Sequence, residues 1–316
     1  MRMIESLLQR TLDPLRLQKT FYPLGFPLFL STNSEAVFQA ADAEWAVWAP
    51  GFDKPPVSLW IEVSKANGAL PASTQFHGHH HLFAYVADAR NFGICDTRAR
   101  MGTAWITASA AEDTAYLRYY FLEAMAYQLI ASLYLTPIHG ACVVRNERGV
   151  ILCGDSGAGK SSLAYACARR GWTYVTDDAT YLIRCGKREV VGNAHQIRLR
   201  PEASGIFPEL AGHAVTVRGN GKPSIEIRTR AVASITAKPR AGVHRLVFLR
   251  RSAGGPARLK SLDKAEARAW GERVLYWWNP EVAAEQQANL LGLLAASRVE
   301  ALEYSDLGAA VDALER

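Results

Sequence analysis

The sequence predicts an α/β core that contains a P-loop, preceded by an N-terminal α+β module. Three observations lead to this fold class. A glycine-rich segment at 154–161 lies between an apolar run and a helical pattern. Residues 26–108 are rich in aromatic and β-branched residues broken by Pro and Gly, which is typical of strands. Between these two regions, residues 111–135 repeat apolar positions with a helical period.

Length and composition favour two domains. The 316 residues suffice for two units of ordinary size, and 49% apolar with 21% charged residues is typical of globular proteins. We place the boundary at the end of the long helical pattern. This gives an accessory module at 1–135, with a role in substrate recruitment or oligomerisation, and a P-loop domain at 136–316.

Several features predict a cytoplasmic protein that does not cross a membrane. No run approaches the roughly 20 apolar residues that span a bilayer. The first 19 residues predict an amphipathic helix and not a secretory signal. The cysteines form no CxxC pair, which favours reduced thiols in a core. These cysteines are Cys95, Cys142, Cys153, Cys167 and Cys185.

The formal net charge of +6 favours anionic partners such as a nucleotide or an acidic protein surface. No nucleic-acid-binding module is recognisable in the sequence, so a nucleic-acid partner is not expected.

The elements are expected in a definite order. In the N-terminal module the predicted strands are 57–63, 81–86 and 103–107, and Thr136-Pro137 is expected to end the long helix. In the second domain, two strands joined by a polar turn lead into the glycine-rich loop, and further short strands and two helices follow it. The predicted strands are 139–145, 149–153, 172–176, 180–184, 196–199, 224–227 and 244–249, and the predicted final helices are 264–276 and 280–296.

Residues 154–161 match the pattern GxxxxGK[ST], in which main-chain N–H groups surround phosphate oxygens. The lysine of such a loop reaches the outer phosphates and the hydroxyl residue after it binds Mg²⁺. The helix that follows directs its positive N-terminal end at the phosphates. The predicted nucleotide site consists of Gly154, Asp155, Ser156, Gly157, Ala158, Gly159, Lys160, Ser161 and Ser162.

Gly171 is placed to end this helix, and the strand after it delivers Asp177 and Asp178 to its C-terminal end. Ligands of α/β sheets bind at that edge. Two adjacent carboxylates there can divide the work between a metal ion and the proton of an attacking hydroxyl. The alternative is that the two aspartates only begin a turn.

The segments around His139, the loop and Asp177-Asp178 together resemble the catalytic core of HPr kinase/phosphorylases. His139 stands 21 residues before Lys160 and Asp178 stands 18 after it, as in that family. The resemblance implies a mixed-sheet core like that of phosphoenolpyruvate carboxykinases and an ATP-dependent serine kinase, able in some members to run the reverse reaction. It further implies that Asp178 is the base, assisted by His139 and Lys160, and that Asp177 supports the base or the metal.

The sequence departs from this family in two places. Ser162 stands where the family usually has glutamate, and the downstream signature EIRGxG is not matched. The nearest stretch begins at Gln196, so Glu202 is left as a candidate to replace the missing Mg²⁺ ligand. The predicted metal ligands are therefore Ser161, Asp177 and Glu202.

The predicted function is transfer of phosphate from ATP, with Mg²⁺, to a serine of a protein or peptide substrate. Two other functions stay open: a non-catalytic nucleotide-binding sensor, and a kinase of small hydroxyl compounds. Homo-oligomerisation through the N-terminal module also stays open.

Other groups of residues have two interpretations each. The histidines at 77 and 79–81 form an exposed turn or a metal site. Arginines at 198, 200, 245, 250 and 251 lie on solvated faces or neutralise phosphate charge. Tyr276-Trp277-Trp278 packs in the core or stacks on a ligand.

Overall fold

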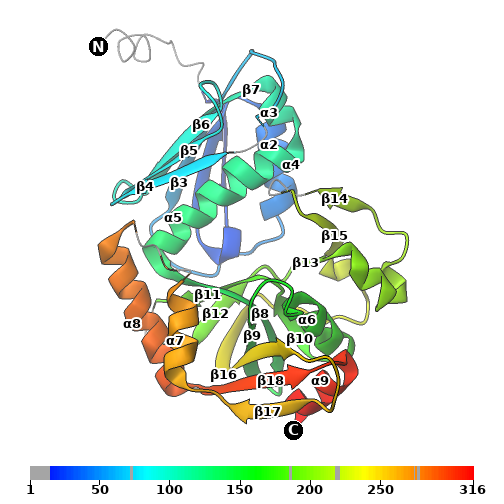
Figure 1. Cartoon of the computed structure of the whole chain (residues 1–316). Coiled ribbons are helices and arrows are strands. Elements are labelled where there is room, and N and C mark those ends of the chain that lie inside the picture. The colour runs from blue at the N-terminus through cyan, green and yellow to red at the C-terminus, as the bar shows by residue number, and fades with distance from the viewer. Residues whose placement is uncertain (1–14, 72–73, 185–186, 218–220, 274, 276–277) are drawn as a thin grey trace. The chain divides into compact units, whose positions relative to one another are not determined.

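The computed structural model describes residues 15–71, 74–184, 187–217, 221–273, 275 and 278–316 (Figure 1). The predicted opening helix lies, up to residue 14, outside these residues, and Leu17–Phe21 is a strand. The chain divides into two compact units between Ile130 and Ala131, within helix α5 (Ala124–Tyr134). Each unit is described by itself.

The first unit contains one sheet of seven strands among its described residues, in the order β1-β2-β3-β7-β6-β5-β4. Strands β2, β3 and β7 run parallel and the other pairs are antiparallel. The strands are β1 Leu17–Phe21, β2 Leu28–Thr32, β3 Val57–Ser64, β4 Gln75–His79, β5 Leu82–Val86, β6 Phe92–Asp96 and β7 Met101–Thr107. Helix α2 (Glu35–Trp45) was not predicted. The sheet is tied to α5 by Tyr85, whose hydroxyl donates to the main-chain oxygen of Ala124.

The long helix expected at 111–135 is interrupted. It consists of α3 (Ala108–Glu112), α4 (Thr114–Leu117), the π-helical turn η2 (Arg118–Glu123) and α5. The break occurs because Asp113 leaves the helical conformation and its carboxylate accepts from the Tyr116 N–H, capping the next turn. The helix ends at Tyr134, just before Thr136-Pro137 as expected, and strand β8 (Leu135–Arg145) begins immediately.

The second unit contains an eight-stranded mixed sheet and a three-stranded sheet, β13-β15-β14, among its described residues. In the larger sheet, β9, β16 and β18 run parallel, so their C-terminal ends lie at one edge. The strands are β8, β9 Arg148–Cys153, β10 Thr173–Thr176, β11 Ala179–Ile183, β12 Glu189–Gly192, β13 Gln196–Leu199, β14 Val215–Val217, β15 Pro223–Arg228, β16 Arg240–Arg251, β17 Arg258–Ser261 and β18 Arg298–Tyr304.

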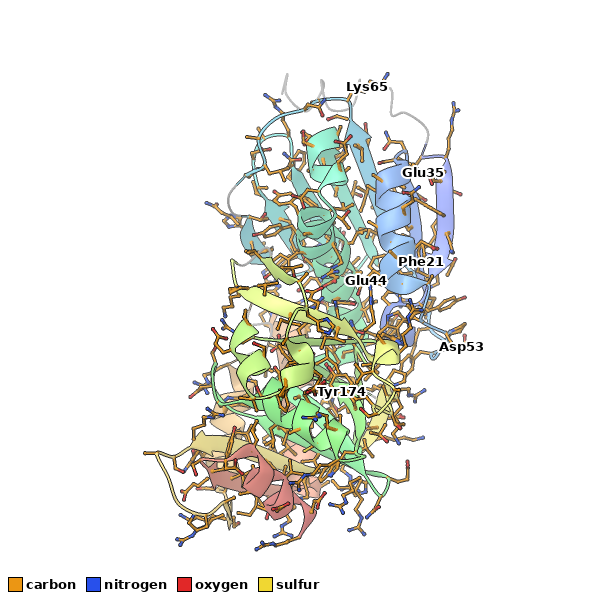
Figure 2. All side chains as sticks on the ribbon, turned by 90° about the vertical axis from the view of Figure 1, so that its right-hand side faces the viewer. Phe21, Glu35, Glu44, Asp53, Lys65 and Tyr174 are labelled. Carbon is orange, nitrogen blue, oxygen red and sulfur yellow. The ribbon has the colours of Figure 1, made fainter. Side chains whose placement is uncertain are left out.

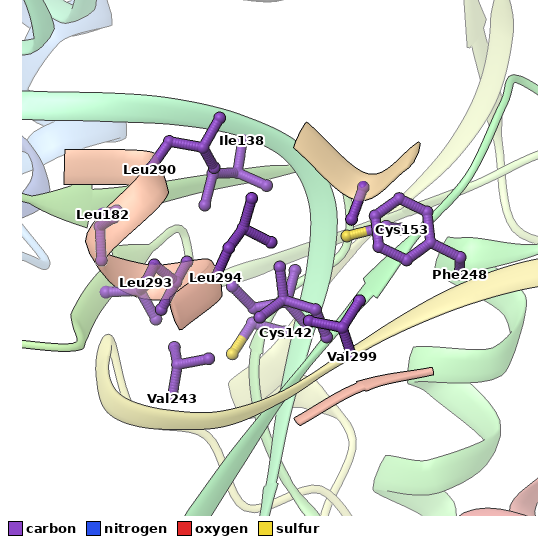
Figure 3. Packing of buried hydrophobic residues seen from close by; sticks show 14 of the residues in the cluster. Ile138, Cys142, Cys153, Leu182, Val243, Phe248, Leu290, Leu293, Leu294 and Val299 are labelled. Carbon is purple, nitrogen blue, oxygen red and sulfur yellow. The ribbon is translucent and has the colours of Figure 1, made fainter. Parts of the chain in front are cut away.

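Both faces of the larger sheet are covered by helices. The helices are α6 Lys160–Arg169, α7 Lys264–Glu272, α8 Pro280–Ala296 and α9 Leu307–Glu315. On one face Ile138 and Cys142 pack with Leu290 and Leu294 of α8 (Figure 3). On the other face the alternate strand residues pack with α6 and α9. Alternation of side chains along each strand thus sends successive residues into two cores.

The expected hairpin before the loop is present. β8 and β9 pair antiparallel up to Arg145 and Arg148, and the two turn residues, Asn146 and Glu147, have φ of 48° and 59°. These angles suit a tight hairpin turn, whose backbone twist matches the strands. β8 also pairs with β11, which places Ala179 opposite His139.

The end of the chain differs from the prediction. Two elements, β18 and α9, follow the helix at 280–296, which was expected to close the fold. The predicted helix at 264–276 ends as α7 at Glu272. Short strands such as β17 and β18 are stabilised by pairing with distant strands, which local sequence patterns do not reveal.

Four cysteines in the described residues, Cys95, Cys142, Cys153 and Cys167, are buried free thiols, as predicted, and Cys185 lies outside the described residues. Burial raises the pKa of all four thiols. Among the described residues, no helix has the length and apolar character needed to cross a membrane.

Candidate active site

The glycine-rich loop joins the end of β9 to the start of α6, as predicted. Gly154, Gly157 and Gly159 have φ of 142°, 87° and 93°, which other residues rarely adopt. An added Cβ at Gly157 would have no atom within 4 Å, so the main chain there is open to a ligand. Strand, loop and helix thus form a site suited to phosphate at a helix N-terminus.

Tyr304 holds the glycine-rich loop in place. Its hydroxyl donates to the main-chain oxygen of Ala158 at 2.6 Å. An added Cβ at Gly159 would lie 2.3 Å from that hydroxyl oxygen. Arg251, opposite Tyr304 in the β16–β18 ladder, lies over the Tyr304 ring at 5.6 Å. The sequence identified Arg251 as a candidate but missed Tyr304, because it stands far along the chain at the end of an unpredicted strand.

Lys160 is 7% exposed, and its ammonium group donates to the main-chain oxygens of Gly154 and Asp155 at 2.9 and 3.1 Å. Burial lowers the pKa of Lys160, and the charge of Asp178 opposes this shift. The lysine therefore lies over the first two residues of the loop, near a carboxylate.

The two adjacent aspartates point in different directions. Asp177 is buried: its Oδ1 accepts from the hydroxyl of Tyr174 at 3.0 Å, and its Oδ2 accepts from the main-chain N–H of Arg198 at 3.1 Å. Tyr174, labelled in Figure 2, is itself fully buried. The side chain of Asp178 is 47% exposed and lies 3.2 Å from Nδ1 of His139. Asp178 is thus the member of the pair that a substrate can reach.

His139 is brought to Asp178 by the pairing of β8 with β11. The pKa of His139 is lowered, first by burial and then by the nearby charge of Lys160, while Asp178 opposes the shift. Both of these effects favour the neutral form of the imidazole. With its proton on Nδ1, it donates to the carboxylate of Asp178.

The remaining predicted metal ligands, Ser161 and Glu202, lie on different elements. Ser161, on the first turn of α6 beside Ser162, donates its hydroxyl to the main-chain oxygen of Asp177 at 3.2 Å. Glu202 lies exposed in a short 3₁₀ helix, Pro201–Gly205. Within the described ranges, no three His, Cys, Asp or Glu side chains form a group able to hold a metal ion. The role of Glu202 in metal binding stays a prediction.

A carboxylate that sequence reasoning missed lies beside Gln196. Glu226, on β15, accepts from the Gln196 side-chain amide at 2.7 Å and lies 3.4 Å from Nε of Arg198. Residue 226 faces residue 198 across the β13–β15 ladder. Only this pairing of two strands about 30 residues apart reveals the contact.

The other candidates have mainly structural partners. Arg245 bonds Glu300 and the main-chain oxygen of Leu314. His80, with φ of 51°, lies in the turn between β4 and β5, which agrees with an exposed turn. Tyr276 and Trp277 lie outside the described residues, and Trp278 is half-buried.

The loop residues fit a nucleoside triphosphate, because open main chain at Gly157 and the ammonium group of Lys160 lie at the same loop. Mg²⁺ prefers oxygen ligands, and the hydroxyl of Ser161, on the first turn of α6, offers one next to the loop. When bound, the ion would offset negative charge on the outer phosphates.

Asp177 predicts a pH-dependent stability. Burial, and next the charge of Asp178, raise its pKa from 3.8 to about 6. A carboxyl with a raised folded-state pKa contributes stability below pH 4 that is lost as the pH rises through 6. In Asp177→Asn the amide can still accept from Arg198 and donate to Tyr174. We therefore expect the free energy of unfolding of this variant, relative to that of wild type, to rise by on the order of 3 kcal/mol between pH 4 and pH 7.

This gain would be measured by urea unfolding at both pH values without Mg²⁺. The control is Asp312→Asn, which removes an exposed carboxylate paired with Arg170. A stability difference for Asp177→Asn that does not change with pH would show that folding does not raise the pKa of Asp177.

Comparisons with known proteins match the segment that contains His139, the loop and the two aspartates. Residues 133–200 match the family model described as the HPr Serine kinase C-terminal domain. The HPr kinase/phosphorylase of Caldicellulosiruptor bescii is 32% identical over 83 residues, covering 26% of this chain and 22% of the relative. That of Bacillus subtilis is 35% identical over 86 residues, covering 27% and 24%. The chain thus spans less than a quarter of the length of these curated relatives.

A solved HPr(Ser) kinase/phosphatase structure from Coxiella burnetii is 13% identical with a TM-score of 0.30, covering 57% of this chain and 93% of that one. The family-model match contains the loop, His139 and both aspartates, whereas Glu202 and Tyr304 lie beyond it. In this segment the sequence is therefore similar to that of HPr kinase/phosphorylases.

Proposed function

We propose that this protein transfers the γ-phosphoryl group of ATP to a serine hydroxyl of a protein or peptide. The observation that carries the proposal is the half-exposed carboxylate of Asp178, 3.2 Å from His139 and close to the lysine of the loop. A nucleotide-binding module without transfer activity needs the loop and the lysine but not this exposed acid–base pair.

In the proposed reaction, the main-chain N–H groups of the loop and the ammonium of Lys160 hold the phosphates. Lys160 exchanges its bonds to two loop carbonyls for bonds to phosphate oxygens. The acceptor oxygen bonds to the γ-phosphorus as the bond to the bridging oxygen breaks and ADP leaves. Asp178 takes the hydroxyl proton, and the N–H of His139 orients its carboxylate.

The first unit, residues up to Ile130, is proposed to recruit the substrate or to mediate self-association. Asp177 is proposed to act mainly by position, because both its oxygens accept bonds from the protein. These bonds hold β13 against the end of β10 and keep Asp178 directed outward.

The test is transfer of labelled γ-phosphate, with Mg²⁺, to a degenerate library of serine-containing peptides and to a lysate of the source organism. We expect Lys160→Ala to lower transfer at least 100-fold, because the outer phosphates lose their positive charge. Lys260→Ala, which removes only an exposed pair with Glu303, is the matched control. Circular dichroism would verify that both variants fold.

Labelled acceptor formed by wild type and by Lys260→Ala, but not by Lys160→Ala, supports the kinase. ATP binding without any labelled peptide or protein would instead favour the nucleotide sensor. A labelled small molecule in the lysate would favour a small-molecule kinase.

A further inference from the structure

A cleft of about 370 Å³ lies beside the loop, entirely within the second unit. Its walls are formed by Gly154 and Asp155, by the end of β16 at Phe248–Arg250, and by one side of α7. It therefore lies at the C-terminal ends of β9 and β16, the edge of a sheet where ligands bind. Its volume is near the lower end of the range for ligand pockets.

The position of Lys160 shows which end of a nucleotide would lie beside this cleft. The lysine of such a loop contacts the outermost phosphates, and here its ammonium lies against the oxygens of Gly154 and Asp155. The charge of Asp155 also acts on both His139 and Lys160. The cleft thus borders the end of the loop that would hold the γ-phosphate, where the acceptor must approach.

The chemistry of the cleft suits a peptide. Trp270 packs edge-on against Phe248 at 5.3 Å and forms an apolar wall. At the rim, Arg250 pairs with Glu266 at 2.5 Å and Arg273 lies 3.5 Å from Asp155. All four charged side chains are about half exposed or more, so these pairs contribute little to stability and exchange partners readily. A guanidinium released from such a pair can bind an incoming carboxylate through two hydrogen bonds.

We propose that this cleft is the acceptor subsite, and that it takes a peptide segment with an acidic residue near the phosphorylated serine. Arg250 and Arg273 bind the acidic side chain, and Trp270 contacts an apolar residue of the same segment. This inference rests on the proposed kinase function and adds the class of acceptor to it.

The experiment compares two serine-peptide libraries, one with Asp and Glu and one with Lys and Arg around the serine, using the full chain. Wild type is expected to prefer the acidic library. Arg273→Glu is expected to raise KM for acidic peptides at least tenfold and to shift the preference toward basic peptides, because the rim then carries an added negative charge. KM for ATP is expected to stay within twofold.

Arg268→Glu is the matched control, since Arg268 lies on α7, which Arg273 directly follows, but pairs with Glu272 outside the cleft. Trp270→Ala is a second variant, expected to raise the peptide KM without changing the acid preference. Peptide preference unchanged in Arg273→Glu, or a loss of ATP affinity with peptide KM unchanged, would overturn the acceptor assignment alone. Absence of transfer by wild type to any peptide, with ATP bound, would overturn the kinase proposal and this inference together.

Discussion

Asp178→Asn is expected to lower the rate of phosphoryl transfer by about 100- to 10,000-fold, the range that a general base contributes. The amide cannot accept a proton at neutral pH. It can still accept a hydrogen bond from Nδ1 of His139, which lies 3.2 Å from the Asp178 carboxylate in the structure. Because Asp178 is half exposed and not part of the core, the fold should not change. ATP affinity should also stay within a few-fold, since the loop and Lys160 are untouched.

This result would be measured as labelled phosphate transferred per second at saturating ATP and acceptor, with ATP affinity from calorimetry. The control Asp312→Asn, an equally exposed aspartate on α9, should transfer at the wild-type rate. Full activity of Asp178→Asn would show that another group takes the proton. His139, which lies beside Asp178, would then be the residue to replace next.

Gly159→Ala is expected to lower nucleotide affinity by roughly 100-fold, equivalent to about 3 kcal/mol. Two effects act together. A φ of 93° is strained for any residue with a Cβ, and this Cβ would lie 2.3 Å from the hydroxyl oxygen of Tyr304. The loop must therefore move away from Tyr304, which breaks the 2.6 Å bond to Ala158 and displaces the N–H groups that bind phosphate.

The double variant Gly159→Ala/Tyr304→Phe separates these two effects. Removing the hydroxyl relieves the clash and leaves the backbone strain, so the double variant should bind nucleotide more tightly than Gly159→Ala alone. Tyr304→Phe by itself should weaken binding only several-fold, because one hydrogen bond to Ala158 is lost. If the losses of nucleotide affinity in the two single variants simply add in the double variant, Tyr304 does not restrict position 159.

The sequence predicted well those features that depend on neighbouring residues. The loop, the helix after it, the hairpin before it and Gly171, with φ of 86° at the helix end, all follow from short patterns. A glycine-rich phosphate loop needs particular residues within a few positions of one another, so its pattern survives in the sequence itself. The long helix at 111–135 was predicted less well, because Asp113 provides a cap that local periodicity does not register.

Contacts that depend on strand pairing could not be predicted from the sequence. Tyr304 meets the loop because β18 runs parallel to β16, and Glu226 meets Gln196 because β15 pairs with β13. The cleft beside the loop likewise combines residues from three elements that are separated by up to about 120 positions. Such contacts depend on which strands pair, and pairing is decided by packing across the whole sheet.

The sequence by itself determined that a glycine-rich loop is followed by a strand ending in two aspartates, with a histidine at the start of the hairpin that precedes the loop. Only the tertiary structure decided which aspartate a substrate can reach. The bonds from Tyr174 and from the N–H of Arg198 hold Asp177 inside the protein, and the β8–β11 pairing brings His139 to Asp178 at the surface. Adjacent residues at a strand end point to opposite sides, and the packing of β13 fixed which side is buried.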